Sequence, residues 1–214
     1  MATNESFDID GPAGRLEAIL MRPEGEAVAA GVVCHAHPLH GGMMHFKVVF
    51  RAAKALQENG VAALRFNFRG VGASAGTHDG GQGEQDDVRA ALDAAARRFP
   101  GLPLLLGGFS FGAAMAMSVA ARDTRAGAVF ALGLPVSRMS DIGALQRITA
   151  PRLFVQGERD EFASGESLRA LVEPLQEPKR LRVIAESDHF FNGHLDLLQA
   201  EVSDWVATRP WAAA

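Results

Sequence analysis

Hydrophobic residues along this chain gather in short continuous runs that alternate with polar and glycine-rich segments. Runs without polar interruption are typical of strands that are buried on both faces of a parallel sheet. The runs predict strands at residues 29–34, 61–66, 102–106, 126–132, 152–156 and 181–185. An earlier pair, near residues 6–10 and 16–21, is predicted to add antiparallel strands at the N-terminal edge of the sheet.

Helices are predicted between these strands. The segments with helical patterns are residues 45–58, 84–99, 113–117, 164–172 and 191–206, whereas residues 134–150 hold at most a short helix. The glycine-rich residues 70–83 are predicted to form a long surface loop. Strands that alternate with helices indicate an α/β fold, in which helices cover both faces of a mostly parallel central sheet.

Composition limits the possible classes of protein. With 214 residues, 48% of them hydrophobic, and no composition shift, we expect a single domain over residues 1–214. The net charge of −4 and the lack of a basic stripe argue against nucleic acid as a partner. The polar, acidic first ten residues do not resemble a secretory signal, and Cys34 is the only cysteine. Both features favour a cytoplasmic location.

Residues 99–121 carry no charge and are long enough to suggest a membrane span. Pro103 and the pair Gly107-Gly108 divide this run into two pieces of strand and helix length. We therefore expect no association with a membrane.

The run Gly108-Phe109-Ser110-Phe111-Gly112 lies between a predicted strand and a predicted helix. A G-x-S-x-G sequence at a strand–turn–helix junction is typical of a nucleophile elbow, which exposes the serine hydroxyl at its tip. Glycines are needed there because side chains would clash with the neighbouring strand or helix. The start of the helix adds partial positive charge and free N–H groups near Ser110. The alternative is a serine that only caps the helix.

An acidic loop and a histidine follow later strands, where the active residues of such sheets collect. We assign Asp160, just past strand 152–156, as the acid, with Glu158 and Glu161 as close rivals. His189, just past strand 181–185, is the predicted base, and His194 is the alternative. Asp188 is a poor partner for His189, because neighbours on an extended segment point to opposite sides.

The order serine, acid, histidine is an order known for catalytic triads on a fold of this class. A serine hydroxyl is a poor nucleophile until a neutral imidazole takes its proton. A buried carboxylate then orients the imidazole and stabilises the imidazolium.

A tetrahedral intermediate also needs backbone donors for its oxyanion. We assign the N–H of Phe111 and the N–H of His37, with Leu39 as the alternative to His37, whereas Pro38 cannot donate. The histidines of the same loop could instead bind zinc. These histidines are His35, His37, His40 and His45. Leu39 stands where the matching metal pattern has an acidic residue, and we expect no metal.

Five segments together resemble the α/β-hydrolase superfamily. They are HAHPLHGG at 35–42, RFNFRGVGASAG at 65–76, GGFSFGA at 107–113, VQGERD at 155–160 and ESDHFF at 186–191. The chain is most similar in these segments to small bacterial dienelactone-hydrolase-like and prolyl-oligopeptidase-like esterases. The resemblance implies a triad of Ser110, Asp160 and His189, and no cofactor. Dienelactone hydrolases have a cysteine nucleophile and haloalkane dehalogenases an aspartate, where this chain has Ser110.

A lid domain usually follows the sixth strand in this superfamily, and residues 134–150 are too few for one. We therefore expect an open site with apolar walls. The side chains expected in its walls are Met43, Phe109, Phe162 and Phe190, with Met44, Phe111 and Met139 as further candidates. The expected function is hydrolysis of small carboxylic esters. The alternatives are a peptidase or amidase with the same triad, and a catalytically silent binding protein of the same fold.

Overall fold

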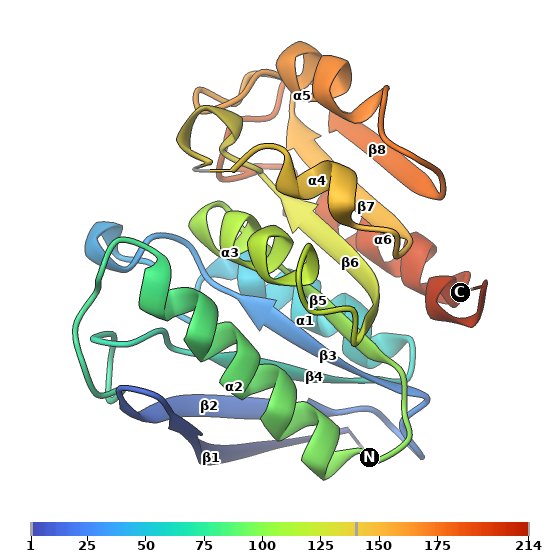
Figure 1. Ribbon diagram of the computed structural model, residues 1–214. Coiled ribbons are helices and arrows are strands. Elements are labelled where there is room, and N and C mark those ends of the chain that lie inside the picture. Colours follow the sequence, from blue (N-terminus) through green and yellow to red (C-terminus); the bar gives the residue numbers. More distant parts are fainter. Residues whose placement is uncertain (1, 140, 214) are drawn as a thin grey trace.

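An eight-stranded sheet runs through the computed structural model of the chain, which describes residues 2–139 and 141–213 (Figure 1). The strands are β1 (Thr3–Gly11), β2 (Gly14–Arg22), β3 (Ala29–Cys34), β4 (Val61–Phe66), β5 (Leu104–Phe109), β6 (Ala126–Leu132), β7 (Arg152–Gly157) and β8 (Lys179–Ile184). They lie in the order β1-β2-β4-β3-β5-β6-β7-β8. From β4 to β8 neighbouring strands are parallel, whereas β1, β2 and β4 pair antiparallel. The predicted fold class is confirmed.

Helices cover both faces of this sheet. They are α1 (Lys47–Glu58), α2 (Gln82–Arg98), α3 (Phe111–Ala120), α4 (Ala144–Arg147), α5 (Gly165–Val172) and α6 (Leu195–Ala207), with short 3-10 turns η1 (Pro38–His40), η2 (Val136–Arg138) and η3 (Pro210–Ala213). Helices α1 and α6 pack together on one face, and α2 and α3 on the other (Figure 1). The described part of the segment between β6 and β7 holds only η2 and α4, so no lid domain lies there. Within the described residues, no helix is both long and apolar enough to cross a membrane.

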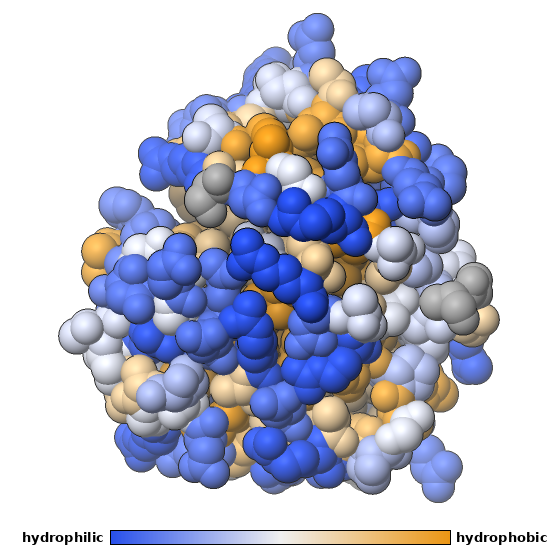
Figure 2. All heavy atoms as spheres, viewed as in Figure 1, coloured by the Kyte–Doolittle hydropathy of each residue, from blue (hydrophilic) through white to orange (hydrophobic). Residues whose placement is uncertain are grey.

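Two hydrophobic cores, one on each side of the sheet, explain the continuous apolar runs. Val32 packs into the core under α2 and α3, and its neighbour Val33 packs into the core under α1 and α6. Leu106 and Leu105 divide between the two cores in the same way. Because successive strand residues point to opposite faces, a sheet that is covered on both sides needs apolar residues at every position. Hydrophilic residues make up most of the face shown in Figure 2, whereas hydrophobic residues gather mainly toward the top of this view.

Strand β5 is longer at its carboxyl end than predicted. The expected strand covered residues 102–106, and β5 begins at Leu104 and continues through Gly107 and Gly108 to Phe109. This glycine pair does not interrupt the strand, because both residues keep their partners in β3 and β6. A Cβ on Gly107 would lie 2.4 Å from the ring of Phe130, so the glycine here makes room for an aromatic side chain of the next strand.

The last helix begins later than predicted. Residues 191–194 form a turn instead of the first helical turn, and α6 starts at Leu195. Phe191 has φ 55° and Gly193 has φ 75°, which are incompatible with a right-handed helix. The turn directly follows His189 and sets the direction in which the chain leaves the carboxyl edge of the sheet.

A buried ion pair anchors the long loop of residues 70–83. The carboxylate of Asp87 on α2 accepts from the backbone N–H of Arg69 at 3.0 Å and from its guanidinium Nη2 at 2.8 Å. The same Nη2 donates to the carbonyl of Gly83 at 2.6 Å. The side chains of Arg69 and Asp87 are 10% and 0% exposed, so removing one of them leaves the charge of the other buried away from water.

We expect Asp87→Ala to lower the free energy of unfolding by about 3–5 kcal/mol, because the Arg69 guanidinium then loses its buried counterion and keeps only the exposed Asp79, at 3.5 Å. Urea unfolding followed by circular dichroism measures the change. Asp86→Ala on the same helix is the matched control. Asp86 pairs with Arg89 at 2.5 Å in a half-exposed position, and its loss should cost at most about 1 kcal/mol. Equal losses in both variants would contradict the anchoring role of Asp87.

His35 ties the end of β3 to the end of β4. Its Nδ1 lies 2.6 Å from the carbonyl of Ala36, to which it donates, and its Nε2 accepts from the N–H of Phe68 at 3.0 Å. A neutral imidazole provides this combination of one donor and one acceptor. Burial lowers the pKa of His35 from 6.5 to about 4, against a smaller opposing effect of the hydrogen bond to Ala36.

This pKa predicts a loss of stability in mild acid. Between pH 6.5 and pH 4 the unfolded chain binds a proton at His35 and the folded chain does not, so stability falls as pH falls. The loss attributable to His35 is roughly 3 kcal/mol. Unfolding titrations at pH 7, 5.5 and 4 should show a flatter pH dependence for His35→Gln than for the wild type. Identical slopes in the two proteins would disprove the assignment.

Candidate active site

The tight turn between β5 and α3 presents Ser110. Its backbone has φ 55° and ψ −121°, a conformation that non-glycine residues rarely adopt. The N–H of Ser110 donates to the carbonyl of Leu132 at the end of β6, at 2.9 Å. Cβ atoms on Gly108 and Gly112 would lie 2.7 Å and 2.4 Å from backbone oxygens of the chain that leaves β3. The glycines therefore let α3 start directly against β3, as the sequence predicts.

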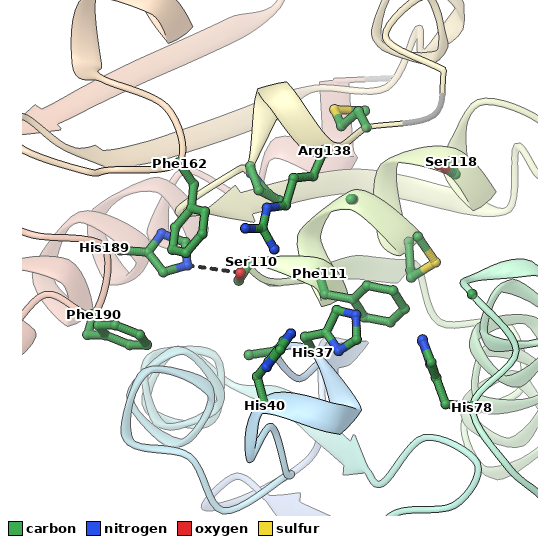
Figure 3. Close-up of a pocket in the computed structure, with 16 residues that line it drawn as sticks. His37, His40, His78, Ser110, Phe111, Ser118, Arg138, Phe162, His189 and Phe190 are labelled. Carbon is green, nitrogen blue, oxygen red and sulfur yellow. Dashed lines mark hydrogen bonds between the residues drawn. The ribbon is translucent and has the colours of Figure 1, made fainter.

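The structure brings Ser110, His189 and Asp160 together at the carboxyl edge of the sheet, and Figure 3 shows the contact between His189 and Ser110. The Nε2 of His189 lies 2.9 Å from the Oγ of Ser110. The Nδ1 of His189 lies 2.7 Å from Oδ2 of Asp160. His189 and Asp160 are 3% and 4% exposed, so this chain of hydrogen bonds is shielded from water except at the serine.

The hydrogen bonds of Asp160 determine which ring nitrogen of His189 carries the proton. The Oδ1 of Asp160 accepts from the N–H of Phe162 at 2.8 Å and of Ala163 at 3.3 Å. An ionised carboxylate can only accept, so the ring proton of His189 sits on Nδ1. Nε2 is then left as the acceptor for the hydroxyl of Ser110.

The alternative acids and the alternative base lie elsewhere. Glu158 is exposed and accepts from the N–H of Glu186 at 3.0 Å, and Glu161 is also exposed. Asp188 accepts from the backbone and side chain of Asn192 at 2.9 Å and 2.8 Å, so it orders the turn after His189. His194 is the N-cap of α6 and does not line the pocket around Ser110.

Gln156 positions the acid, a role that the sequence did not reveal. Its Nε2 lies 2.7 Å from Oδ2 of Asp160 and 2.8 Å from the carbonyl of Ala163, and its Oε1 accepts from the N–H of Leu134 at 3.0 Å. The side chain is fully buried. A polar residue inside the apolar run of β7 was the available signal, because buried amides need partners.

The backbone donors expected for an oxyanion lie on two elements. Phe111 is the first residue of α3, so its N–H has no carbonyl four residues earlier within the helix. His37 lines the pocket and precedes η1. The N–H of Leu39, the alternative donor, points to Nδ1 of His37 at 3.2 Å. Because this N–H is already engaged, Leu39 is less suited than His37 as an oxyanion donor.

A pocket of about 290 Å³ surrounds Ser110. Phe162 and Phe190 line it, as the sequence predicts, together with Phe111 and Met139. The prediction for Phe109 needs correction, as its side chain is fully buried and packs behind His189 with the ring centroids 5.0 Å apart.

Phe109 is the last residue of β5 and belongs to the core under α1 and α6, so strand alternation turns it away from the pocket. Met43 and Met44 also lie outside the lining. Met43 is 43% exposed, and Met44 is buried beside Asn67, whose Oδ1 accepts the Met44 N–H at 2.8 Å.

Basic side chains surround the pocket. The ring of His37 lies 4.6 Å from that of His40 and 4.8 Å from that of His78, and Arg138 lies 4.7 Å above the ring of Phe162. Desolvation, followed by the positive charges of His78, His40 and Arg138, lowers the pKa of His37. None of the lining residues is acidic. His78 and Arg138 come from long loops, in which no sequence pattern indicated their position.

The four histidines considered for zinc do not converge. Both ring nitrogens of His35 are engaged with the backbone, and His45 lines a different depression, beside Glu17. Within residues 2–139 and 141–213, no cluster of three or more His, Cys, Asp or Glu side chains is arranged to hold a metal ion.

Known proteins share both the sequence and this fold. Residues 29–196 match the model of the alpha/beta hydrolase domain. An alpha-beta serine hydrolase homologue from Coxiella burnetii is 40% identical, with a TM-score of 0.90, and the match covers 96% of this chain and 98% of that one. A lidless a/b serine hydrolase from Xanthomonas campestris is 34% identical, with a TM-score of 0.86 and coverage of 97% and 94%.

An uncharacterized protein of Rickettsia prowazekii is 34% identical over 207 residues, which cover 93% of this chain and 87% of that protein. The family match extends from β3 to the start of α6 and so includes Ser110, Asp160 and His189. The chain therefore belongs to the alpha/beta hydrolase family, as a small hydrolase without a lid domain.

Proposed function

We propose that this hydrolase cleaves small carboxylic esters through an acyl-enzyme formed on Ser110. The observation that carries the proposal is the continuous relay from hydroxyl to imidazole to carboxylate, with contacts of 2.9 Å and 2.7 Å. A serine that only capped α3 would need no such relay, and the Ser110 side chain makes no capping hydrogen bond to that helix.

In the first half of the reaction, Ser110 attacks the ester carbonyl while Nε2 of His189 takes its proton. The N–H groups of Phe111 and His37 stabilise the oxyanion of the tetrahedral intermediate. His189 then gives the proton to the leaving alkoxide oxygen, so that the alcohol departs and the acyl group stays on Oγ. Asp160 stabilises the imidazolium that exists between these two transfers.

In the second half, water takes the place of the alcohol. His189 removes a proton from the water as it attacks the acyl-enzyme, and returns this proton to Oγ of Ser110 as the acid leaves. The open pocket, without a lid domain, gives water and alcohol free passage. The proposed partner is thus a small-molecule ester, and the chemistry of these residues needs no cofactor.

The pocket favours small apolar esters over polypeptides. Its volume of about 290 Å³ suits a small ligand, and half of its lining residues carry aliphatic or phenyl side chains. Amide cleavage by the same residues is the alternative within the enzyme class, and a silent binding protein is the alternative outside it. For the location we propose the cytoplasm, because a chain with a single cysteine forms no internal disulfide, which fits a reducing compartment.

We expect Ser110→Ala to lower kcat for 4-nitrophenyl acetate by at least about 10³-fold, and Asp160→Asn to lower it by a comparable factor, because the two side chains act as a unit with His189. Steady-state release of nitrophenolate measures both. Ser167→Ala, at an exposed position on α5, and Glu161→Gln, in the loop beside Asp160, are the matched controls and should keep wild-type kcat.

A fluorophosphonate probe separates an enzyme from a silent binding protein, because only an activated serine reacts with it quickly. Peptide mapping should locate the adduct on Ser110, and Asp160→Asn should slow labelling. Retained ester turnover in Ser110→Ala would refute the mechanism. Faster cleavage of a matched anilide than of the ester would favour the amidase.

A further inference from the structure

The residues that line the pocket lie on two sides of Ser110, and we call the space beside each group an arm of the pocket (Figure 3). One arm lies beside His189 and is lined by Phe162 and Phe190. The other arm follows α3 away from Ser110 and reaches Ser118. Its far side is formed by the segment after β6, including Pro135 and Met139. The two arms differ in their lining and in their exposure to solvent.

The arm along α3 is defined by one helical face. Phe111, Ala114, Met115 and Ser118 all line it, and their spacing of three and four residues places them on the same side of α3. With a rise of 1.5 Å per residue, Ala114 lies about 6 Å and Ser118 about 12 Å along the helix axis from Ser110. These positions therefore mark two depths of the arm.

The chemistry assigns a part of the ester to each arm, and this inference rests on the proposed function. The leaving oxygen must receive its proton from Nε2 of His189, so the alcohol part lies on the side of His189. The oxyanion points to the N–H groups of Phe111 and His37. The remaining substituent of the tetrahedral carbon is the acyl chain, and the direction left for it is the arm along α3.

We propose that the α3 arm is an acyl-binding channel, in which Ala114 and Ser118 limit the length of the acyl chain. Ala114 and Met115 are 5% and 8% exposed, so the channel is desolvated and apolar along its first part. A channel about 12 Å deep holds an unbranched acyl chain of roughly eight to ten carbons. The selected substrates are esters of straight medium-chain fatty acids.

The arm beside His189 is expected to accept alcohol parts of different size. Phe190 is 41% exposed, so the alcohol part of the ester extends from beside His189 toward solvent. Removing apolar surface from water is what discriminates chain lengths, and an alcohol that stays partly in water is discriminated weakly. Selectivity should therefore reside in the acyl chain.

We expect kcat/KM of the wild type for 4-nitrophenyl esters to rise from acetate to about octanoate and to fall at dodecanoate. Ala114→Leu should lower the ratio of kcat/KM for octanoate over butyrate at least tenfold, because the larger side chain closes the channel near its middle. Ser118→Leu should lower the ratio of decanoate over butyrate at least fivefold and change the ratio of hexanoate over butyrate by less than twofold, because it closes only the far end.

Two further variants serve as controls. Ala170→Leu makes the same substitution at an exposed position of α5 and should leave the chain-length profile unchanged. Phe190→Ala should change the preference between ethyl and 1-naphthyl butyrate and shift the acyl profile by less than twofold. Thermal unfolding of each variant establishes that it is folded, and Ser118→Leu alone carries the test if Ala114→Leu does not fold.

The outcomes separate this inference from the proposed function. If the wild type hydrolyses esters but Ala114→Leu and Ser118→Leu both keep its chain-length profile, the acyl channel is refuted while the esterase stands. If the α3 variants change the alcohol preference and Phe190→Ala changes the acyl profile, the assignment of the arms is reversed and the inference falls. A wild type that cleaves no ester of either series refutes the proposed function itself.

Discussion

The close approach of α3 to the end of β3 is the steric constraint on which the site depends. The two segments meet at Gly112, where any Cβ would lie 2.4 Å from the carbonyl oxygen of His35. Beside this close approach the turn at Ser110 has its rare φ of 55°, and the hydrogen bond from Ser110 to Leu132 holds the turn from the other side. The loop of His37 and the N-terminus of α3 are thereby placed beside the same hydroxyl. The strain of this turn is compensated by the close packing on both sides of it.

The parallel sheet then brings distant parts of the chain to one edge. Ser110 and His189 are 79 positions apart in the sequence, and His189 and Asp160 are 29 apart, yet each follows the carboxyl end of a strand. Parallel pairing alone brings the strand ends to the same edge, and the loops that follow must place the side chains of the triad within hydrogen-bond distance. Gln156 does so by linking the acid loop to the segment after β6 through its buried amide. Its three hydrogen bonds fix the direction of the amide, which suits a side chain that must hold Asp160 in one orientation.

The sequence was sufficient for the features that depend on local pattern. Continuous apolar runs predicted the parallel strands, because a sheet covered on both faces requires them, and the glycines around Ser110 predicted the turn. Features that depend on side-chain direction were harder to predict. Phe109 lies next to Ser110 in the chain, but strand alternation sends its ring into the opposite core. Arg138 and His78 reach the pocket from long loops, whose paths are determined by tertiary contacts such as the pair of Arg69 and Asp87. No periodicity in the sequence records such contacts.

The distribution of charge around Ser110 follows from the same arrangement. The chain as a whole carries a net charge of −4, yet the lining of the pocket has no carboxylate and includes Arg138 and three histidines besides His189. Asp160, the acid of the relay, is buried behind His189, and its Oδ1 accepts from the N–H groups of Phe162 and Ala163. A negative charge that develops on a substrate oxygen at Ser110 therefore faces backbone donors and the guanidinium of Arg138, in a partly desolvated pocket where such interactions are strong. The neutral ester gains little from this field, whereas the oxyanion formed from it is stabilised. Catalysis requires this preference for the transition state over the ground state.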